Sequence, residues 1–330
     1  MKLKSTIFRG FVVIAIIPLM LLSLFVYVYT KNMLENDIRK DMEIVSKNTS
    51  NKISRYLFER MKDIQTWNSL YIDVQRNNQR FRDSLRIINK QNSIYSTIVN
   101  IDQNNEIIFS TNGKIPQNSK AEFDIIKMLG KFRMAKEMTQ TYYSEMFYSS
   151  YLNNNVIAFV SINRQQNNNL KILAGYLDAM FIYQIVENEI EISKLQEDNG
   201  FIAVYNDEGI VFLAPEFQRK DIYLRMKTLV GSMRNELARS EEHELLNNVY
   251  LVNSIDLEQF ILDDNNIWRV AVFKDKEIAF RCVYLLRNFL VLLSTLVVLI
   301  STFVSSYLSV SISKPIHAVS ELILKVSKDI

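Results

Sequence analysis

Hydrophobic and polar positions divide the chain into two uncharged segments near its ends and a mixed region between them. The segment 11–29 contains no charged residue, and neither does the segment 288–313. A helix needs about 20 apolar residues to cross the hydrocarbon core of a bilayer, so each segment is long enough. A buried core helix is the alternative, but both segments are too long and too uniformly apolar for it. We therefore expect transmembrane helices over 11–30 and 285–310.

The first apolar segment lies where a cleaved signal peptide would also lie. Its apolar core is longer than the usual signal peptide core, and Tyr27, Tyr29 and Lys31 follow it in place of a small-residue cleavage site. We therefore expect an uncleaved anchor. The short tail over 1–10 is basic and has no acidic residue, which favours a cytoplasmic N-terminus, although the flanks of the two segments are nearly equal in charge.

Residues 31–90 contain neither glycine nor proline, and their apolar positions recur at steps of mostly three, four or seven. This spacing indicates one face of a long helix that leaves the membrane. The positions of this stripe are Leu34, Ile38, Met42, Val45, Thr49, Ile53, Leu57, Ile64, Trp67 and Tyr71. Such a stripe packs either on its own domain or on a second copy of the chain. For at least the distal half of the helix we expect packing within the chain.

Beyond residue 90 the pattern changes to short β-rich runs separated by polar turns, and the new pattern occurs twice. Each unit has a hairpin, a charged helical stretch and a second hairpin. These lie at 97–110, 121–138 and 156–178 in the first unit, and at 201–214, 217–245 and 248–273 in the second. An internal repeat of this kind predicts an α+β fold with two tandem antiparallel sheets. We expect the membrane-distal unit over 91–190 and the membrane-proximal unit over 191–281.

Composition argues against several classes of function. The net charge is +3, from 39 basic and 36 acidic residues, which is too balanced for a protein whose main partner is nucleic acid. Cys282 is the only cysteine, and His243 and His317 are the only histidines, so disulfides within the chain, cysteine metal sites and paired-histidine catalysis are not expected. The sequence has no glycine-rich phosphate loop and no hydrolase or metalloprotease motif. We expect no enzyme activity, cofactor or metal in these residues.

Two groups of charged residues have an ordinary interpretation. His243 lies in the run EEHEL (241–245), which we interpret as a solvated helical face. Glu187, Glu189 and Glu191 alternate along the chain, and we interpret them as a solvated face rather than as a metal cluster.

The last twenty residues contain a second periodic pattern. Pro315 follows the second apolar segment, where it suits the first turn of a new helix. Steps of three, four, three and four then separate the residues of an a/d heptad seam, which are Ile316, Val319, Ile323, Val326 and Ile330. Such a seam joins two parallel helices, so we expect a linker helix over 311–330 and a homodimer. An amphipathic helix lying on the membrane surface is the alternative.

The order of these elements resembles that of the bacterial double-Cache sensory receptors, over essentially the whole chain. Two segments carry the resemblance. The segment AFVSINRQQNNNLKILAGYLDAMFIYQIV (158–186) looks like the last two strands of the membrane-distal unit, with a Gly-x-x-Asp strand that leads into the connecting helix. The segment ISKPIHAVSELILKVSKDI (312–330) looks like the start of a HAMP linker.

The resemblance implies a receptor of the bacterial inner membrane whose region 31–285 is extracytoplasmic. It would sense a small molecule and signal to an output module beyond residue 330. A histidine kinase, a chemotaxis transducer and a diguanylate cyclase are all compatible with the sequence. A membrane-anchored binding or adhesion module without an output is the alternative, but it leaves the heptad seam without a purpose.

The resemblance also implies a ligand site in the membrane-distal unit. In relatives that bind amino acids, an aspartate of the last strand takes the ligand's ammonium group, and Asp178 stands at that position. Their Arg-x-Trp-Tyr run, which takes the carboxylate, is missing between residues 120 and 160. Here the chain has Arg133, Tyr142, Tyr143 and Tyr148 instead. We expect these five residues to bind an amino acid, amine or organic acid.

Each candidate ligand residue also has a structural interpretation. Half-buried strand positions would account for the tyrosines, which stack and form hydrogen bonds at low entropic cost in either role. Asp178 directly precedes a helical pattern, so a helix cap would account for it equally well.

Overall fold

The computed structural model describes most of the chain, in two units. The described residues are 2–73, 78–116, 120–132, 139–164, 170–206, 211–213, 241–245, 248–257 and 268–326. One unit combines residues 1–40 with 276–330, and the other comprises residues 41–275. The long helix α1 (Lys2–Asp73) begins in the first unit and continues into the second.

The unit 41–275 contains two antiparallel sheets of five strands each. The strand order is β2-β1-β5-β4-β3 in the first sheet and β7-β6-β10-β9-β8 in the second, so the two sheets have the same topology. The first sheet consists of β1 (Tyr95–Ile101), β2 (Ile107–Ser110), β3 (Thr139–Ser149), β4 (Asn154–Arg164) and β5 (Leu170–Asp178). The second consists of β6 (Phe201–Asn206), β7 (Val211–Leu213), β8 (Glu241–Leu245), β9 (Asn248–Asp256) and β10 (Trp268–Asp275). The predicted α+β repeat is confirmed.

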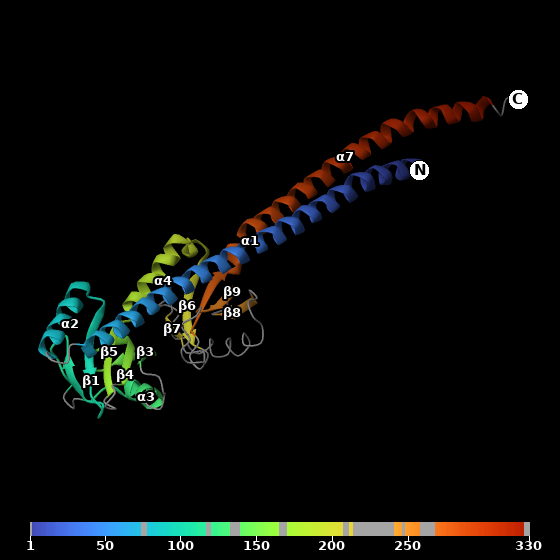
Figure 1. Ribbon diagram of the computed structural model, residues 1–330. Coiled ribbons are helices and arrows are strands. Elements are labelled where there is room, and N and C mark those ends of the chain that lie inside the picture. Colours follow the sequence, from blue (N-terminus) through green and yellow to red (C-terminus); the bar gives the residue numbers. More distant parts are fainter. Residues whose placement is uncertain are drawn as a thin grey trace. The chain divides into compact units, whose positions relative to one another are not determined.

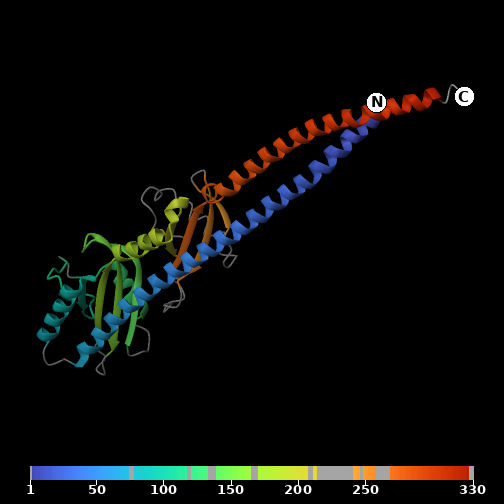
Figure 2. The same cartoon turned by 90° about the horizontal axis from the view of Figure 1, so that it is seen from above.

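Short helices complete this unit. They are α2 (Asn78–Asn92) before β1, α3 (Phe123–Phe132) before β3, and α4 (Met180–Ile192) with the 3₁₀ turn η1 (Leu195–Asp198) between the sheets. Beyond residue 40, α1 runs alongside both sheets (Figures 1 and 2). The buried residues of α1 include Met42, Ile53, Leu57 and Ile64, which confirms packing of the predicted stripe within the chain for these positions.

Gly175 of β5 allows α1 to lie close to the first sheet. A Cβ atom at this position would come within 2.5 Å of Ile64 Cδ1 and 2.8 Å of the Tyr95 ring. The glycine of the Gly-x-x-Asp strand is therefore required by packing. We call the face of the first sheet that Gly175 presents to Ile64 the α1 face.

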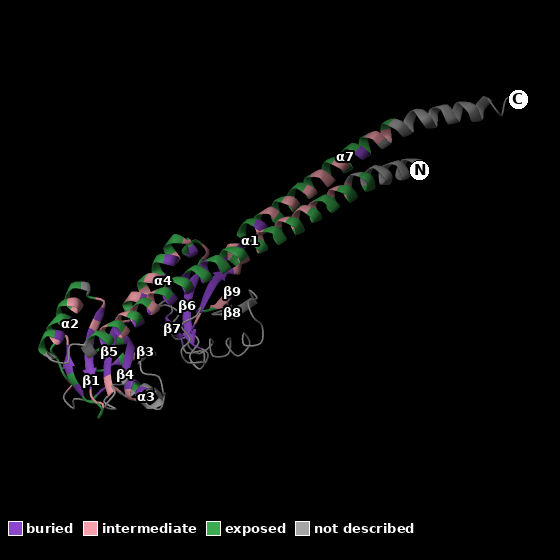
Figure 3. Cartoon of the chain, viewed as in Figure 1, coloured by how far each residue is buried: buried purple, intermediate pink, exposed green. Residues whose placement is uncertain are grey.

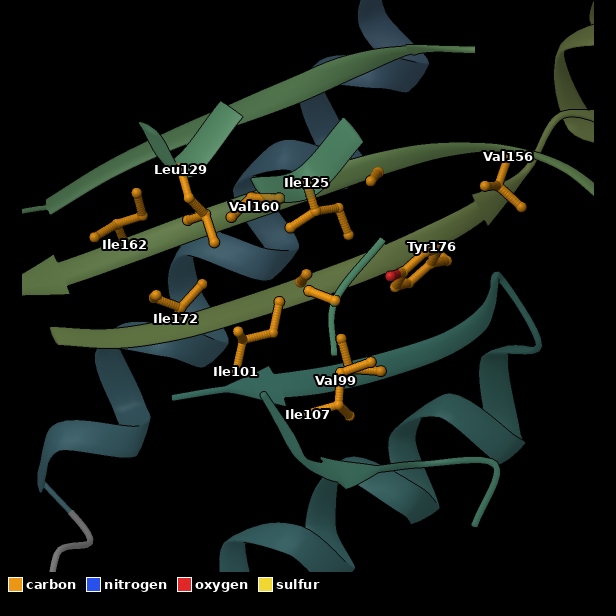
Figure 4. Close-up of a cluster of buried hydrophobic side chains, with 13 residues drawn as sticks. Val99, Ile101, Ile107, Ile125, Leu129, Val156, Val160, Ile162, Ile172 and Tyr176 are labelled. Carbon is orange, nitrogen blue, oxygen red and sulfur yellow. The ribbon is translucent and has the colours of Figure 1, made fainter. Parts of the chain in front are cut away.

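The opposite face of the first sheet, which we call the α3 face, carries an apolar core cluster. Ile125 and Leu129 of α3 pack there on Val160 of β4 and on Ala174 and Tyr176 of β5. Figure 4 shows this cluster in front of the sheet, with α1 behind it. The described strand residues in both sheets are largely buried (Figure 3).

The unit of residues 1–40 and 276–330 is helical. It contains the start of α1, the short helix α6 (Lys276–Ala279) and the long helix α7 (Arg281–Val326). By length and composition, α1 and α7 each include a segment that is apolar enough to cross a membrane. The hydroxyls of Ser23 and Ser294 lie 3.4 Å apart, within hydrogen-bond range across the pair. Small hydroxyl residues of this kind join transmembrane helices.

The structure corrects three predictions made from periodicity. EEHEL (241–245) is strand β8, in which His243 pairs with Tyr250 of β9. Charged residues are tolerated at a sheet edge, so the helical interpretation was wrong. Pro315 lies inside α7, so no new helix begins there; a proline removes one helical hydrogen bond, and α7 continues past it. The predicted single helix over 31–90 is divided into α1, which ends at Asp73, and α2, which begins at Asn78.

Glu189 of α4 was also misassigned. It is buried, with 4% of its surface exposed, and forms an ion pair with Lys52 of α1. Glu187 and Glu191 are exposed as predicted. The seam residues from Ile316 to Val326 lie on α7, where only the backbone is described, and Ile330 lies outside the described residues.

Candidate functional site

The α3 face of the first sheet contains a buried tyrosine hydroxyl next to a carboxylate. Tyr176 is fully buried, with 0% of its surface exposed. Among the residues that the structure describes, neither Tyr176 Oη nor Glu122 Oε2 has a hydrogen bond of ordinary distance and angle. Burial raises the pKa of Tyr176, and the charge of the Glu122 carboxylate and its contact with the Tyr176 hydroxyl raise it further. The hydroxyl and the carboxylate are therefore neighbours that interact with each other.

Glu122 directly precedes α3 and reaches towards the turn between β3 and β4. Its Oε1 accepts long contacts from Ser150 Oγ, at 3.4 Å, and from the Tyr151 backbone N–H, at 3.3 Å. The rings of Tyr151 and Phe147 both lie edge-on to the Tyr176 ring, with centroids 6.1 and 6.5 Å away. The Tyr176 ring, next to the carboxylate, thus contacts two further aromatic rings.

A network of hydrogen bonds lies beside the Tyr151 ring, and its members bond to one another. The Tyr151 hydroxyl lies 2.8 Å from Ser110 Oγ and donates to the Lys114 carbonyl at 2.6 Å. Ser110 Oγ donates to Asn112 Oδ1 at 2.6 Å and lies 2.8 Å from Thr97 Oγ1. These contacts fix Tyr151, so the ring that borders Tyr176 is held in place.

Asp178 lies at the end of β5 on the same face as Tyr176, two residues along the strand. Both of its carboxylate oxygens have partners. Oδ1 accepts a hydrogen bond from the Met180 backbone N–H at 2.8 Å, and Oδ2 accepts one from Asn154 Nδ2 at 2.7 Å. The first of these contacts reaches the first residue of α4, but Asp178 is not the N-cap, which is Ala179 and has no side-chain capping hydrogen bond.

The candidate tyrosines do not converge on Asp178. Tyr142 pairs with Val160 and therefore lies on the α3 face, two strands away from β5 and about 13 Å further along the sheet. Tyr148 is exposed, and its hydroxyl donates to Asn153 at the β3–β4 turn. Arg133 lies outside the described residues.

Tyr143 lies on the α1 face and connects the two sheets. Its ring packs on Phe159 of β4 and edge-on to Trp268 of β10, with centroids 6.1 and 6.0 Å away. Burial raises the pKa of Tyr143 to about 12. Nearby, Asn206 of β6 donates a hydrogen bond to Glu145 Oε1 at 3.0 Å. Strand β3, irregular between Tyr143 and Met146, is thus the strand of the first sheet that contacts the second.

The sequence-based prediction did not include Glu122, Tyr151 or Tyr176. Tyr176 lies inside the quoted Gly-x-x-Asp strand, and its alternation with Asp178 placed it on the same face. Glu122 had no comparable signal, because its role depends on the path of the loop before α3. Among the described residues, no group of three or more histidine, cysteine or acidic side chains is placed to hold a metal ion.

Comparison with known proteins yields matches among solved structures. No protein-family model matches the sequence, and neither does any curated protein. The ligand-binding domain of the Pseudomonas fluorescens chemoreceptor CtaA, in complex with L-leucine, aligns with a TM-score of 0.55 and 14% identity. The alignment covers 76% of this chain and 99% of that domain.

Two further ligand-binding domains are similar to the same extent. That of the Pseudomonas aeruginosa amino acid chemoreceptor PctB, in complex with L-Arg, has a TM-score of 0.55 and 15% identity, covering 74% of this chain and 98% of that one. That of Mlp24, with asparagine, has a TM-score of 0.54 and 15% identity, covering 76% and 98%.

The chain has the fold of these ligand-binding domains. The double-Cache resemblance is thereby confirmed for the fold. The alignments span the sensor domains almost completely, so both sheets and a long N-terminal helix belong to the shared architecture.

Proposed function

We propose that the chain is the sensing and transmembrane part of a bacterial receptor, with residues 31–285 outside the cytoplasm. The observation that supports this proposal is the match of the double-sheet fold to nearly the full length of chemoreceptor ligand-binding domains. Those domains were solved with bound amino acids. The ligand proposed for this chain is therefore a small organic molecule, bound on the α3 face of the first sheet.

Helix α1 is the element that connects ligand binding to the membrane. Asn68 Nδ2 donates to the Ser161 carbonyl of β4 at 2.9 Å, and Ser46 Oγ donates to Asn253 Oδ1 of β9 at 2.7 Å. These two contacts are separated by about 33 Å along the helix. A helix tied to both sheets transmits a displacement of either one as a rigid rod. The ligand can shift the receptor only by its differential affinity for two states.

The strand β3 provides a second connection. The turn after β3 touches Glu122, and the middle of β3 touches the second sheet through Tyr143 and Glu145. A ligand that displaces the β3–β4 turn would therefore also displace β3 where it contacts the second sheet.

Titration of the full chain in nanodiscs against amino acids, amines and organic acids tests the sensing function. We expect at least one compound to raise the unfolding temperature, because a ligand that binds only the folded state stabilises it. If no compound of these classes does so, the sensor proposal fails.

The membrane topology is tested with Cys282, which is the only cysteine and is exposed. We expect a membrane-impermeant maleimide to label Cys282 in intact cells. The matched variant carries Ser5→Cys in a Cys282→Ser background, and its cysteine should react only after the membrane is opened. The reverse labelling pattern would place the sheets in the cytoplasm.

We propose a homodimer joined by the seam that includes Val319, and a kinase, chemotaxis or cyclase module as recipient of the signal. Val319→Cys in the Cys282→Ser background should form a disulfide between two chains on mild oxidation, because seam residues face each other. Ala318→Cys, one position off the seam, is the matched control. Equal crosslinking of both variants would argue against the seam.

A further inference from the structure

We propose that the groove between α1 and α7 binds an anionic phospholipid, with one acyl chain in the groove and the phosphate on Arg287. This inference rests on the proposed crossing of the membrane by these two helices and goes beyond the sensing function. The lipid site is separate from the ligand site in the first sheet, so either proposal can fail while the other holds.

The groove lies between two helices of the same unit and has a volume of about 460 Å³. The helices approach each other at Ser23 and Ser294, whose hydroxyl oxygens are 3.4 Å apart. Beside this contact, apolar side chains that line the groove keep 60–63% of their surface uncovered; they are Met20, Leu24, Val291 and Leu299. An empty apolar groove forfeits packing contacts, so in a bilayer it is filled by a lipid chain or by another helix.

The groove extends over the outer half of the two apolar segments. Its innermost residues, Met20 and Leu299, stand near the middle of these segments, and Tyr27 and Arg287 stand at the ends that lead to the sheets. From Arg287 to Leu299 the helix α7 rises about 18 Å. This length is close to half of the hydrocarbon core, which is about 30 Å thick. The groove therefore matches one acyl chain of the outer leaflet.

Arg287 supplies the charge at the outer end of the groove. Its guanidinium lies over the Tyr284 ring, 5.6 Å from the centroid, and its Nε and Nη2 donate to Asn288 Oδ1 at 3.3 Å. Within the described part of the chain, Arg287 forms no ion pair with a carboxylate. A guanidinium has five donors in a planar fork that matches the oxygens of a phosphate. Arg287 can therefore bind a lipid phosphate above the groove.

Charge favours an anionic lipid over a second copy of the chain as the occupant. Lys31 and Arg281 add two cations near the same end, whereas Glu35 is already paired with Arg39. The short helix α6 contributes one residue of each sign. A second copy would bring the same excess of positive charge to this end, but an anionic headgroup neutralises it. The seam at Val319 lies about 30 Å further along α7, so a lipid in the groove is compatible with the proposed dimer.

Native mass spectrometry of the full chain tests the headgroup. The chain is released from micelles that contain equal amounts of phosphatidylglycerol and phosphatidylcholine with the same acyl chains, and the retained lipids and the chains in each particle are counted. We expect the parent chain to retain phosphatidylglycerol in preference. Arg287→Gln should lower its retention about fivefold, because one cation beside the headgroup is lost. The matched control, Arg281→Gln, alters an exposed arginine that does not line the groove and should lower retention less than about twofold.

A second pair of variants tests the acyl chain. Val291→Trp places a large side chain in the groove and should lower the retention of both lipids. Leu292→Trp is the matched control, because Leu292 is exposed on α7 but does not line the groove, and it should leave retention unchanged.

Three results would overturn the inference. Equal retention of the two lipids by the parent chain, or equal effects of the two arginine variants, would remove the role of Arg287. Equal effects of the two tryptophan variants would indicate an unspecific lipid shell. If Val291→Trp separates dimers into single chains and leaves lipid retention unchanged, a second copy occupies the groove. The ligand panel and the labelling of Cys282 test sensing and topology separately, so those proposals survive a failure here.

Discussion

The two sheets have the same topology, but each contains a buried tyrosine, and the hydrogen bonding of the two tyrosine hydroxyls differs. Tyr205 of the second sheet and Tyr176 of the first are both fully buried. Tyr205 Oη lies 2.6 Å from Ser254 Oγ of β9, so its hydrogen bond is made within the protein. Tyr176 Oη has no hydrogen bond of ordinary geometry among the described residues and lies beside the Glu122 carboxylate. The two tyrosines therefore differ in how well their hydroxyls are satisfied within the fold.

On their α1 faces the two sheets are alike. Each uses a buried polar side chain to hold α1, with Asn68 bonded to β4 of the first sheet and Ser46 bonded to β9 of the second. Both units also have a glycine at a close contact, but Gly175 meets Ile64 of α1, whereas Gly200 meets Leu195 of η1 and the Phe273 carbonyl of β10.

The largest expected effect comes from Gly175→Ala. The new Cβ would clash with Ile64 and Tyr95, and overpacking of this kind costs about 2–3 kcal/mol. Gly200→Ala is the counterpart, because its Cβ would meet Leu195 and the Phe273 carbonyl at 2.6 Å. Hydrogen exchange should show faster exchange in β5 for the first variant and in β10 for the second. Equal loss of protection in both sheets would show that they unfold as one unit.

The next effect concerns the connection between α4 and α1. Lys52→Ala would leave the buried Glu189 carboxylate without its cation, and we expect a loss of about 2 kcal/mol, because half of the Lys52 side chain is exposed to water. Urea unfolding followed by tryptophan fluorescence measures this loss. Glu187→Gln on the exposed face of α4 is the control and should change stability by less than about 0.5 kcal/mol. A loss no larger than that of the control would make the ion pair irrelevant to stability.

The paired tyrosines give the sharpest test of the comparison. Tyr205→Phe leaves Ser254 without its partner and should cost about 1.5 kcal/mol in the free energy of unfolding. Tyr176→Phe removes a hydroxyl that has no hydrogen bond of ordinary geometry among the described residues, and it should change stability by less than about 0.5 kcal/mol. Both are measured without ligand. Equal losses would mean that the Tyr176 hydroxyl is satisfied within the fold, and the contrast between the sheets would disappear.

The smallest effect is a pH dependence at the contact between the sheets. Because burial raises the pKa of Tyr143 to about 12, the folded chain keeps this proton at pH values where the unfolded chain has lost it. Its contribution to stability is therefore constant below the unfolded pKa of about 10 and is lost as the pH rises towards about 12. At about pH 11 the parent chain should lose about 1 kcal/mol more than Tyr143→Phe. Identical pH profiles would show that Tyr143 is solvated.

Much of the fold was predictable from local pattern. The predicted hairpins over 156–178 and 248–273 contain β4 with β5 and β9 with β10, because apolar runs between polar turns are a local signal. Strand β8 was not predicted, since EEHEL has no apolar alternation and is a strand only through pairing with β9. Pairing between segments overrides local propensity at a sheet edge.

The candidate site was less predictable. Asp178 was identified by its position in the strand, but only the structure shows that Asn154 and the start of α4 already occupy its two oxygens. Glu189 and Glu187 are only two residues apart, yet one is buried against Lys52 and the other is exposed. Burial of a charge depends on which helix packs beside it, and that information is not local.

By itself the sequence determined the two apolar helices, the repeated α+β unit and the stripe on α1, because each follows from the spacing of side chains along one segment. Only the tertiary structure decided which polar groups are satisfied. Glu122, Tyr151 and Tyr176 come from a loop, a turn and a strand, and their proximity depends on how the sheet places these segments together. Hydrogen bonding is short-ranged and directional, so the chemistry of the site appears only when the chain is folded.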